Sequence, residues 1–322
     1  MFSGTKKSQV HSDQTLPPNA PEAKGKGKAK ARLGKAKDAW YVPWLFLSVA
    51  LIFLITFTAL PVANMFYYSL TDWNGLSKTK DFVGTDNYVE FFTRPELSRV
   101  FLVSLYYMVA SVFQMGIALY FATILSFSTW FRGLFKGILF FPHLLNGVAV
   151  GFVFLYLFRP DGTLDSILAL FGVTETTQWL GNPDVVNVSL ASTSVWRYMG
   201  LNFILFLGAI QSISSDIYEA AEIDGANRWH QFRYLIAPSI KPIISLSFIL
   251  AVSGSLAVFE IPFIMTDGSN GSTTFVIQTV KLAFEDNKVG LASAMAVVLL
   301  LIVLLVTWIQ RILVPDEDVS LS

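Results

Sequence analysis

Long apolar runs separated by polar connections are the main pattern along this chain. Six runs are long enough to cross a hydrocarbon core of about 30 Å, which takes roughly 20 helical residues. They cover residues 44–66, 101–125, 137–158, 188–213, 243–265 and 289–309. None of them alternates apolar and polar positions with a period of two, so a transmembrane β-barrel is not expected. The pattern therefore predicts an all-α membrane protein with six transmembrane helices.

Two of the predicted spans contain a proline. Pro142 lies in the third span and Pro262 in the fifth. Proline lacks a backbone N–H and its ring clashes with the preceding turn, which membrane helices tolerate where neighbouring groups satisfy the freed carbonyl. We expect a kink at each proline.

The composition agrees with this pattern. Of the 322 residues, 53% are hydrophobic and only 14% are charged, which leaves too little polar surface to cover a water-soluble globule. The sequence contains no cysteine, so disulfides and thiolate metal sites are excluded.

The net charge of zero hides a strong asymmetry near the N-terminus. Nine lysines and arginines precede the first apolar run, at positions 6, 7, 24, 26, 28, 30, 32, 35 and 37. Positive charge beside the first span favours a cytoplasmic N-terminus, and six crossings then place the C-terminus on the same side. We expect a basic, disordered cytoplasmic tail at 1–39, a membrane domain at 40–314 and a short cytoplasmic tail at 315–322. The long basic region argues against a cleavable signal peptide.

The connection between the fourth and fifth spans, residues 214–242, is unusually polar and contains YEAAEIDGANRWHQFRYLIAPSIKP. Asp216 is placed to cap a helix, with Glu219 at the capping-box position. Ala220 and Ala221 keep one face of that helix low, and Gly225 is a natural point for the chain to leave it.

A second helical run follows from Ala226. It places Trp229, Phe232 and Ile236 on one apolar stripe, and we expect it to end before Pro238 because a residue that precedes proline disfavours the α region. The loop therefore predicts a cytoplasmic helix-turn-helix. The residues alone favour equally a docking element and an amphipathic loop that rests on lipid headgroups.

This loop resembles the EAA loop of permease subunits of binding-protein-dependent ABC importers. Ala237 replaces the leucine that the pattern usually has before its first proline. The segments SLTDWNG, FVGTDNYVEFF, FRGLFKGILFFPHLL and FEIPFIMTDG also resemble the carbohydrate-type branch of these permeases, in the same order along the chain. The loop positions that match the pattern are Glu219, Ala220, Ala221, Asp224, Gly225, Ala226, Phe232, Pro238 and Pro242.

The resemblance implies a subunit of a larger transporter in the bacterial cytoplasmic (inner) membrane. In that family the loop is the coupling helix that contacts a cytoplasmic ATPase, so the resemblance implies contact positions at Glu219, Ala220, Ala221, Asp224 and Gly225. The implied partners are a second permease subunit that is a non-identical homologue, two copies of an ABC ATPase, and an extracytoplasmic solute-binding protein. No GxxxxGK[ST] stretch occurs, so ATP and Mg are expected on the ATPase and no cofactor on this chain.

Polar residues within the spans are candidates for the substrate path, because they are costly in lipid. Arg197 and Glu260 are charged, although snorkelling to the outer interface would explain both. Tyr198 and Asn202 lie one helical turn apart and suit a sugar, through ring stacking and hydrogen bonds to hydroxyls. Ser255 lies in an SGS notch that close helix packing would also explain.

Gln114, His143 and Asn146 are weaker candidates, since interhelical hydrogen bonds account for most such residues. The histidines, His11, His143 and His230, have no metal-binding spacing. No catalytic constellation and no nucleic-acid-binding pattern is present, so an intramembrane enzyme is disfavoured.

We therefore predict a permease subunit without an ATPase site of its own, which imports a sugar or oligosaccharide by alternating access. The alternative is an ion-coupled secondary transporter, which typically has inverted repeats and ionisable residues at the bilayer midplane.

Overall fold

The computed structural model describes residues 41–127, 132–173 and 177–313. The predicted tails at 1–39 and 315–322 lie outside these residues. Apart from one isolated bridge between Thr71 and Phe82, the regular elements that are described are helical, which confirms the all-α prediction. The chain separates into two compact units, Met1–Leu60 and Pro61–Ser322.

In the first unit, the described residues form α1 (Tyr41–Leu54) and the π-helical turn η1 (Ile55–Ala59). Apolar side chains dominate this stretch and are open to the surroundings, as with Phe46 and Phe57, which are 78% and 70% exposed. Such a surface suits lipid and not water. The candidate span Trp44–Ser69 extends from this unit into α2 (Leu60–Ser69).

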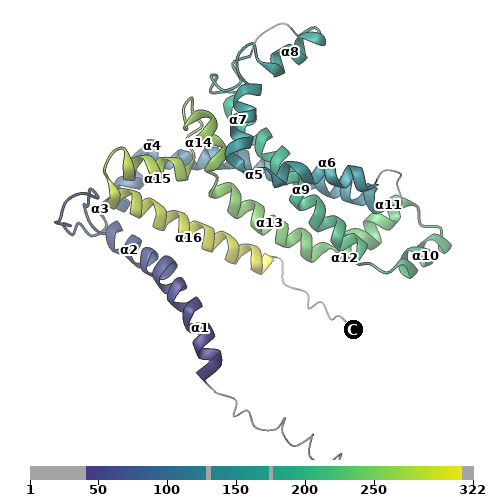
Figure 1. Cartoon of the computed structure of the whole chain (residues 1–322), viewed down its shortest axis with the longest axis horizontal. Helices are drawn as coiled ribbons and strands as arrows, with labels where there is room; N and C mark the ends of the chain where they lie inside the picture. Colours follow the sequence, from purple (N-terminus) through teal and green to yellow (C-terminus); the bar gives the residue numbers. More distant parts are fainter. Residues whose placement is uncertain (1–40, 128–131, 174–176, 314–322) are drawn as a thin grey trace, which may run out of the picture. The chain divides into compact units, whose positions relative to one another are not determined.

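The second unit carries the remaining helices, coloured from blue to yellow in Figure 1. Their bounds are α3 (Asp86–Thr93), α4 (Pro95–Ser98), α5 (Val100–Ser126), α6 (Arg132–Leu144), α7 (Gly147–Leu157), α8 (Thr163–Leu170), α9 (Val186–Gln211), α10 (Ser215–Ile223), α11 (Arg228–Gln231), η2 (Phe232–Ile236), α12 (Ala237–Ser239), α13 (Lys241–Leu256), α14 (Glu260–Thr266), α15 (Phe275–Phe284) and α16 (Val289–Leu313).

The membrane-spanning pattern is consistent with the six predicted spans but differs from them in detail. Within the described residues, four helical spans are long and apolar enough to cross a membrane, and the number rises to six if each of two bent helix pairs counts as one span. The bent pairs are α6 with α7, at 97°, and α9 with α10, at 72°. The third predicted span is therefore a broken helix.

The breaks do not fall at the prolines where kinks were expected. Pro142 remains inside α6, and the chain turns at Asn146, whose side chain accepts a hydrogen bond from Val148 N and caps α7. The fifth span breaks between α13 and α14, and Pro262 lies in the first turn of α14. A first-turn N–H has no intrahelical partner, so proline costs little there.

The central packing joins α5 and α9, which run side by side (Figure 1). Ala118 and Ala122, one turn apart on α5, are completely buried in a cluster with Phe203 and Phe206 of α9. Small residues on one helix let the backbones approach, and aromatic rings from the other fill the space. α9 is thus held firmly along its C-terminal half.

Four of the described helices lie in the connections after the first, third and fifth predicted spans, which are the outer connections if the N-terminus is cytoplasmic: α3, α4, α8 and α15. α8 forms within the segment GTLDSILALFG, residues 162–172. α15 was not predicted, and it packs against α16 and α5 with Phe275 and Ile277 completely buried. Thr274 caps it by accepting a hydrogen bond from Ile277 N.

Candidate functional site

The polar loop 214–242 begins with α10. The cap is Ser214, whose side chain accepts a hydrogen bond from Asp216 N at 3.3 Å. The expectation that Asp216 caps this helix is therefore wrong, because Ser214 has the extended backbone (ψ 139°) of a capping residue and Asp216 already lies in the first turn. Its carboxylate still favours the helix N-terminus electrostatically. Glu219, one turn further, is exposed.

The chain leaves α10 at Gly225, as predicted. Gly225 has φ +78°, a conformation that costs other residues about 1–2 kcal/mol. Ala226 N donates to Ala221 O at 2.9 Å, and Gly225 N donates to Glu222 O at 3.0 Å. These two bonds form a Schellman motif, which satisfies the last carbonyls of α10 and fixes a sharp turn.

The second half of the loop continues further than predicted. Asn227 caps α11 by accepting a hydrogen bond from His230 N at 2.9 Å. A π-helical turn then lets Ala237 N donate to Phe232 O, and Ala237 keeps helical angles of −58° and −41°. The helix therefore passes through Pro238 instead of ending before it, because the wider π turn relieves the crowding between the proline ring and the preceding turn.

Only part of the predicted apolar stripe is buried. Ile236 is completely buried in the cluster that contains Phe206 and Ile210 of α9, whereas Trp229 is 64% exposed. Ile223, at the end of α10, is 87% exposed. The loop is thus anchored at its C-terminal end, and its tip presents apolar side chains beside exposed acidic ones, a combination typical of a docking surface.

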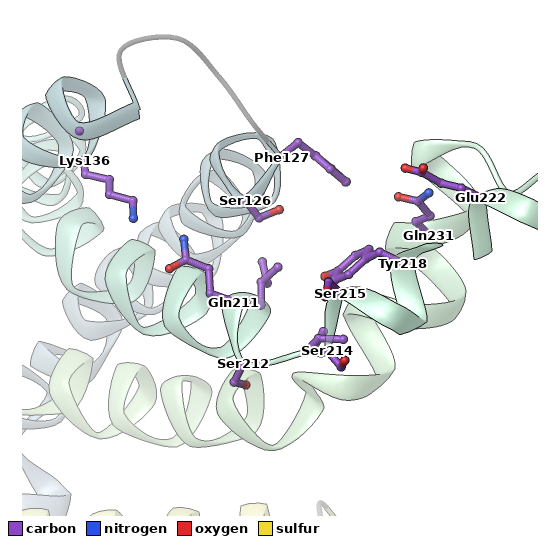
Figure 2. A pocket seen from close by; sticks show the side chains of 13 residues that line it. Ser126, Phe127, Lys136, Gln211, Ser212, Ser214, Ser215, Tyr218, Glu222 and Gln231 are labelled. Carbon is purple, nitrogen blue, oxygen red and sulfur yellow. The ribbon is translucent and has the colours of Figure 1, made fainter. Parts of the chain in front are cut away.

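A cleft of about 820 Å³ lies between α10, the C-terminal ends of α5 and α9 and the N-terminal end of α6. In Figure 2, Lys136 and Gln211 lie on one side of the cleft, and Tyr218 and Glu222 lie on the other. The Tyr218 hydroxyl is buried without a hydrogen-bond partner among the described residues, and burial raises the pKa of this phenol. α10 is connected to α9 through the three-residue link 212–214 and through Tyr218, which packs against the buried cluster of α5 and α9.

The charged candidates Arg197 and Glu260 are brought together in the membrane domain. Arg197 Nη1 lies 2.6 Å from Glu260 Oε2, and it also donates to the Tyr198 hydroxyl at 3.2 Å. The side chain of Arg197 is 13% exposed and that of Glu260 is 40% exposed. Arg197 therefore binds a carboxylate of the same chain instead of snorkelling to the interface.

The other candidates are less tightly grouped. Tyr198 is 38% exposed on α9, and Asn202 lies half-buried one turn further on the same helix. Ser255 is buried, and its hydroxyl donates to Val252 O within α13. The Ser255 hydroxyl thus has a partner within its own helix, as close packing requires.

The three weaker candidates have different environments. The ring of His143 lies 6.4 Å from that of Tyr198, centroid to centroid. Asn146 caps α7 with its side chain. Gln114 is 4% exposed, and among the described residues its Nε2 has no hydrogen-bond partner. The interhelical hydrogen bond that was expected to satisfy Gln114 is therefore not formed by this nitrogen.

One residue of this region was missed from the sequence. A Cβ atom at Gly147, the first residue of α7, would overlap Arg197 Nη1 and Glu260 Oε2. Only glycine lets the ion pair lie against the start of α7. The small-residue spacing GVAVG, with Gly147 and Gly151 one turn apart, was the available signal.

Comparison with known proteins covers most of the chain. Residues 114–318 match the family described as binding-protein-dependent transport system inner membrane component. The probable ABC transporter permease protein YurN of Bacillus subtilis is 31% identical over 280 residues, which cover 84% of this chain and 94% of YurN. The multiple sugar-binding transport system permease protein MsmF of Streptococcus mutans is 30% identical, and the match covers 84% of this chain and 94% of MsmF.

The fold also matches a solved structure. A chain of the crystal structure of a bacterial alginate ABC transporter, in complex with its alginate pentasaccharide-bound periplasmic protein, superposes with a TM-score of 0.76 at 19% sequence identity. The superposition covers 85% of this chain and 93% of that chain. At this identity the likeness establishes the fold.

Proposed function

We propose a carbohydrate as the transported solute, starting from the fact that this chain belongs to the family of binding-protein-dependent transport system inner membrane components. The chain is thus a multi-pass inner-membrane permease subunit of an ABC importer, which works with a solute-binding protein. Relatives of similar identity are described as transporting multiple sugars and starch degradation products. These descriptions favour a sugar or oligosaccharide here.

The observation that carries the coupling proposal is the exposed tip of loop 214–242. Glu219, Ala220 and Asp224 are exposed on a short helix whose end is fixed by the Schellman turn at Gly225. In this proposal the tip docks on a separate cytoplasmic ATPase, one of two copies, which bind ATP and Mg. The small side chains of Ala220 and Ala221 let the ATPase approach the backbone of α10 closely, so that motion is transmitted through packed atoms.

The transport path requires a second permease subunit, which we propose to be a non-identical homologue. Tyr198 and Asn202 are the side chains of α9 proposed to contact the sugar, one by ring stacking and one by hydrogen bonds. The charges of Arg197, next to Tyr198 in the sequence, and of Glu260 neutralise each other. Ser255, on α13, is the remaining candidate for the path. Such a path has no net charge, which suits an uncharged saccharide.

Co-purification tests the assignment. A tagged form of this chain, solubilised in mild detergent, is expected to bring with it a stoichiometric ABC ATPase and a second permease. The alternative of an ion-coupled secondary transporter predicts instead that the purified chain alone accumulates solute in proteoliposomes under an ion gradient. Uphill uptake by the isolated chain would overturn the proposed function.

A further inference from the structure

The breaks in two predicted spans meet at one point on α9. α7 begins at Gly147, immediately after the break in the third span, and α14 begins at Glu260, immediately after the break in the fifth. Arg197 of α9 binds Glu260 at 2.6 Å, and both charged groups lie against Gly147. Three helices are therefore joined through a single ion pair.

The two half-helices also pack directly on each other. A Cβ atom at Gly147 would overlap the Glu260 carboxylate, and one at Gly151 would lie 2.7 Å from Ile264 Cγ2. Gly147 and Gly151 are one turn apart on α7, and Glu260 and Ile264 are one turn apart on α14. The two glycines thus let one face of α14 pack directly against the backbone of α7, so that α7 and α14 form one packed unit.

α9 connects this unit to the inner loop. It is a continuous helix, Val186–Gln211, and the link 212–214 leads from its end directly to α10. Arg197 lies in its middle. Any displacement that α10 imparts to α9 reaches Arg197 through an unbroken helix, which transmits motion as a rigid element.

We propose that Arg197, Glu260 and Gly147 form a three-helix clamp through which α9 carries the half-helices α7 and α14 with it during transport. The inference rests on the proposed function only in taking α10 as the coupling helix. Arg197 and Glu260 are then positioning residues. They bind each other, and neighbouring side chains such as Tyr198 contact the sugar.

The Arg197–Glu260 ion pair is better suited to positioning the helices than to stabilising the fold. The pair is only partly shielded from water, with Arg197 13% and Glu260 40% exposed. Desolvation offsets part of its attraction, so it contributes little net stabilisation, yet separating the partners leaves the nearly buried Arg197 without its counter-charge. This penalty on separation fixes where α14 sits relative to α9, and the close approach of both charged groups to Gly147 fixes the start of α7 against them.

Distance measurements between spin labels test the clamp. The chain contains no cysteine, so Val153→Cys on α7 and Leu205→Cys on α9, both at exposed side chains, can be labelled without background from this chain, and the assembled transporter without these two cysteines serves as the labelling control. In the transporter assembled with its co-purified partners, we expect the same inter-label distance without nucleotide and after trapping with ATP and vanadate. A shift of that distance on trapping would overturn the clamp, because α7 would then move independently of α9.

Variants separate the ion pair from general packing. Glu260→Gln and Arg197→Gln are each expected to broaden the Val153–Leu205 distance distribution and to shift its mean on trapping. The double variant is expected to match the single ones, because partners that act as one unit are not additive. Gly147→Ala is expected to give the same broadening, since the new methyl group overlaps both charged groups. Distributions identical to the unaltered chain in all these variants would also overturn the proposal.

A matched glycine controls for helix propensity. Gly208 lies on α9, and a Cβ atom there meets nothing within 4 Å. Gly208→Ala is therefore expected to leave the Val153–Leu205 distance distribution unchanged, both without nucleotide and after trapping. The nucleotide-free measurement can be made on this chain in nanodiscs without an ATPase. Failure of an ATPase to co-purify would therefore count against the proposed function alone, whereas a nucleotide-free distribution that Glu260→Gln leaves unchanged would count against the clamp alone.

Discussion

Gly225→Pro is expected to yield a protein that inserts into the membrane normally but no longer retains the ATPase. Gly225 has φ +78°, which the proline ring cannot adopt, and its N–H donates to Glu222 O in the turn that ends α10. The variant therefore loses both the turn and a hydrogen bond at the proposed docking surface. The amount of ATPase that co-purifies should fall about tenfold or more, equivalent to ~1.4 kcal/mol of binding free energy.

Gly172→Pro is the matched control. Gly172 also has positive φ, +84°, and its surroundings are equally open, but it follows α8 in a predicted outer connection. It should leave ATPase retention unchanged. A complementary change, Glu219→Lys, reverses a charge at an exposed position of α10 and should also lower retention. Full retention with both Gly225→Pro and Glu219→Lys would remove the coupling assignment.

Gly200→Leu is expected to produce the largest loss of stability. A Cβ atom at Gly200 of α9 would lie 2.5 Å from Leu139 O and 2.9 Å from Phe140 Cα of α6. These are backbone atoms, so the larger side chain can be accommodated only if α6 moves away from α9. Overpacking of this kind costs about 1–3 kcal/mol or more, and the thermal unfolding midpoint in detergent should fall by several degrees.

Gly208→Leu provides the comparison on the same helix. A Cβ atom at Gly208 meets nothing within 4 Å, so leucine can project without displacing a neighbour, and the midpoint should stay close to that of the unaltered chain. Equal midpoints for Gly200→Leu and Gly208→Leu would contradict the close approach of α6 and α9.

The turn at Gly225 shows what local chemistry can predict. Acidic residues near the start of α10, alanines on one face and a glycine at the end are interactions within one turn of helix, so the helix and its exit were visible in the sequence. The same local reasoning failed at Pro238. The π turn that carries the helix through this proline is held by the burial of Ile236 and Ile240 against the bundle, and that burial is a long-range interaction.

The Arg197–Glu260 pair marks the corresponding limit for the candidate site. Both residues were identified as candidates because charge within an apolar run is costly, yet they are 63 positions apart and nothing local indicates that they meet. Gly147 was missed for the same reason, since its importance depends on two side chains from other helices.

By itself, the sequence determined the membrane environment, the apolar spans, the turn at Gly225 and the family resemblance, because each depends on composition or on residues within a few positions of one another. Only the tertiary structure decided where the third and fifth spans break, which charges pair, and which glycines are needed for close approach. Those features arise where separate helices compete for the same space, so they are fixed by packing between segments distant in the chain.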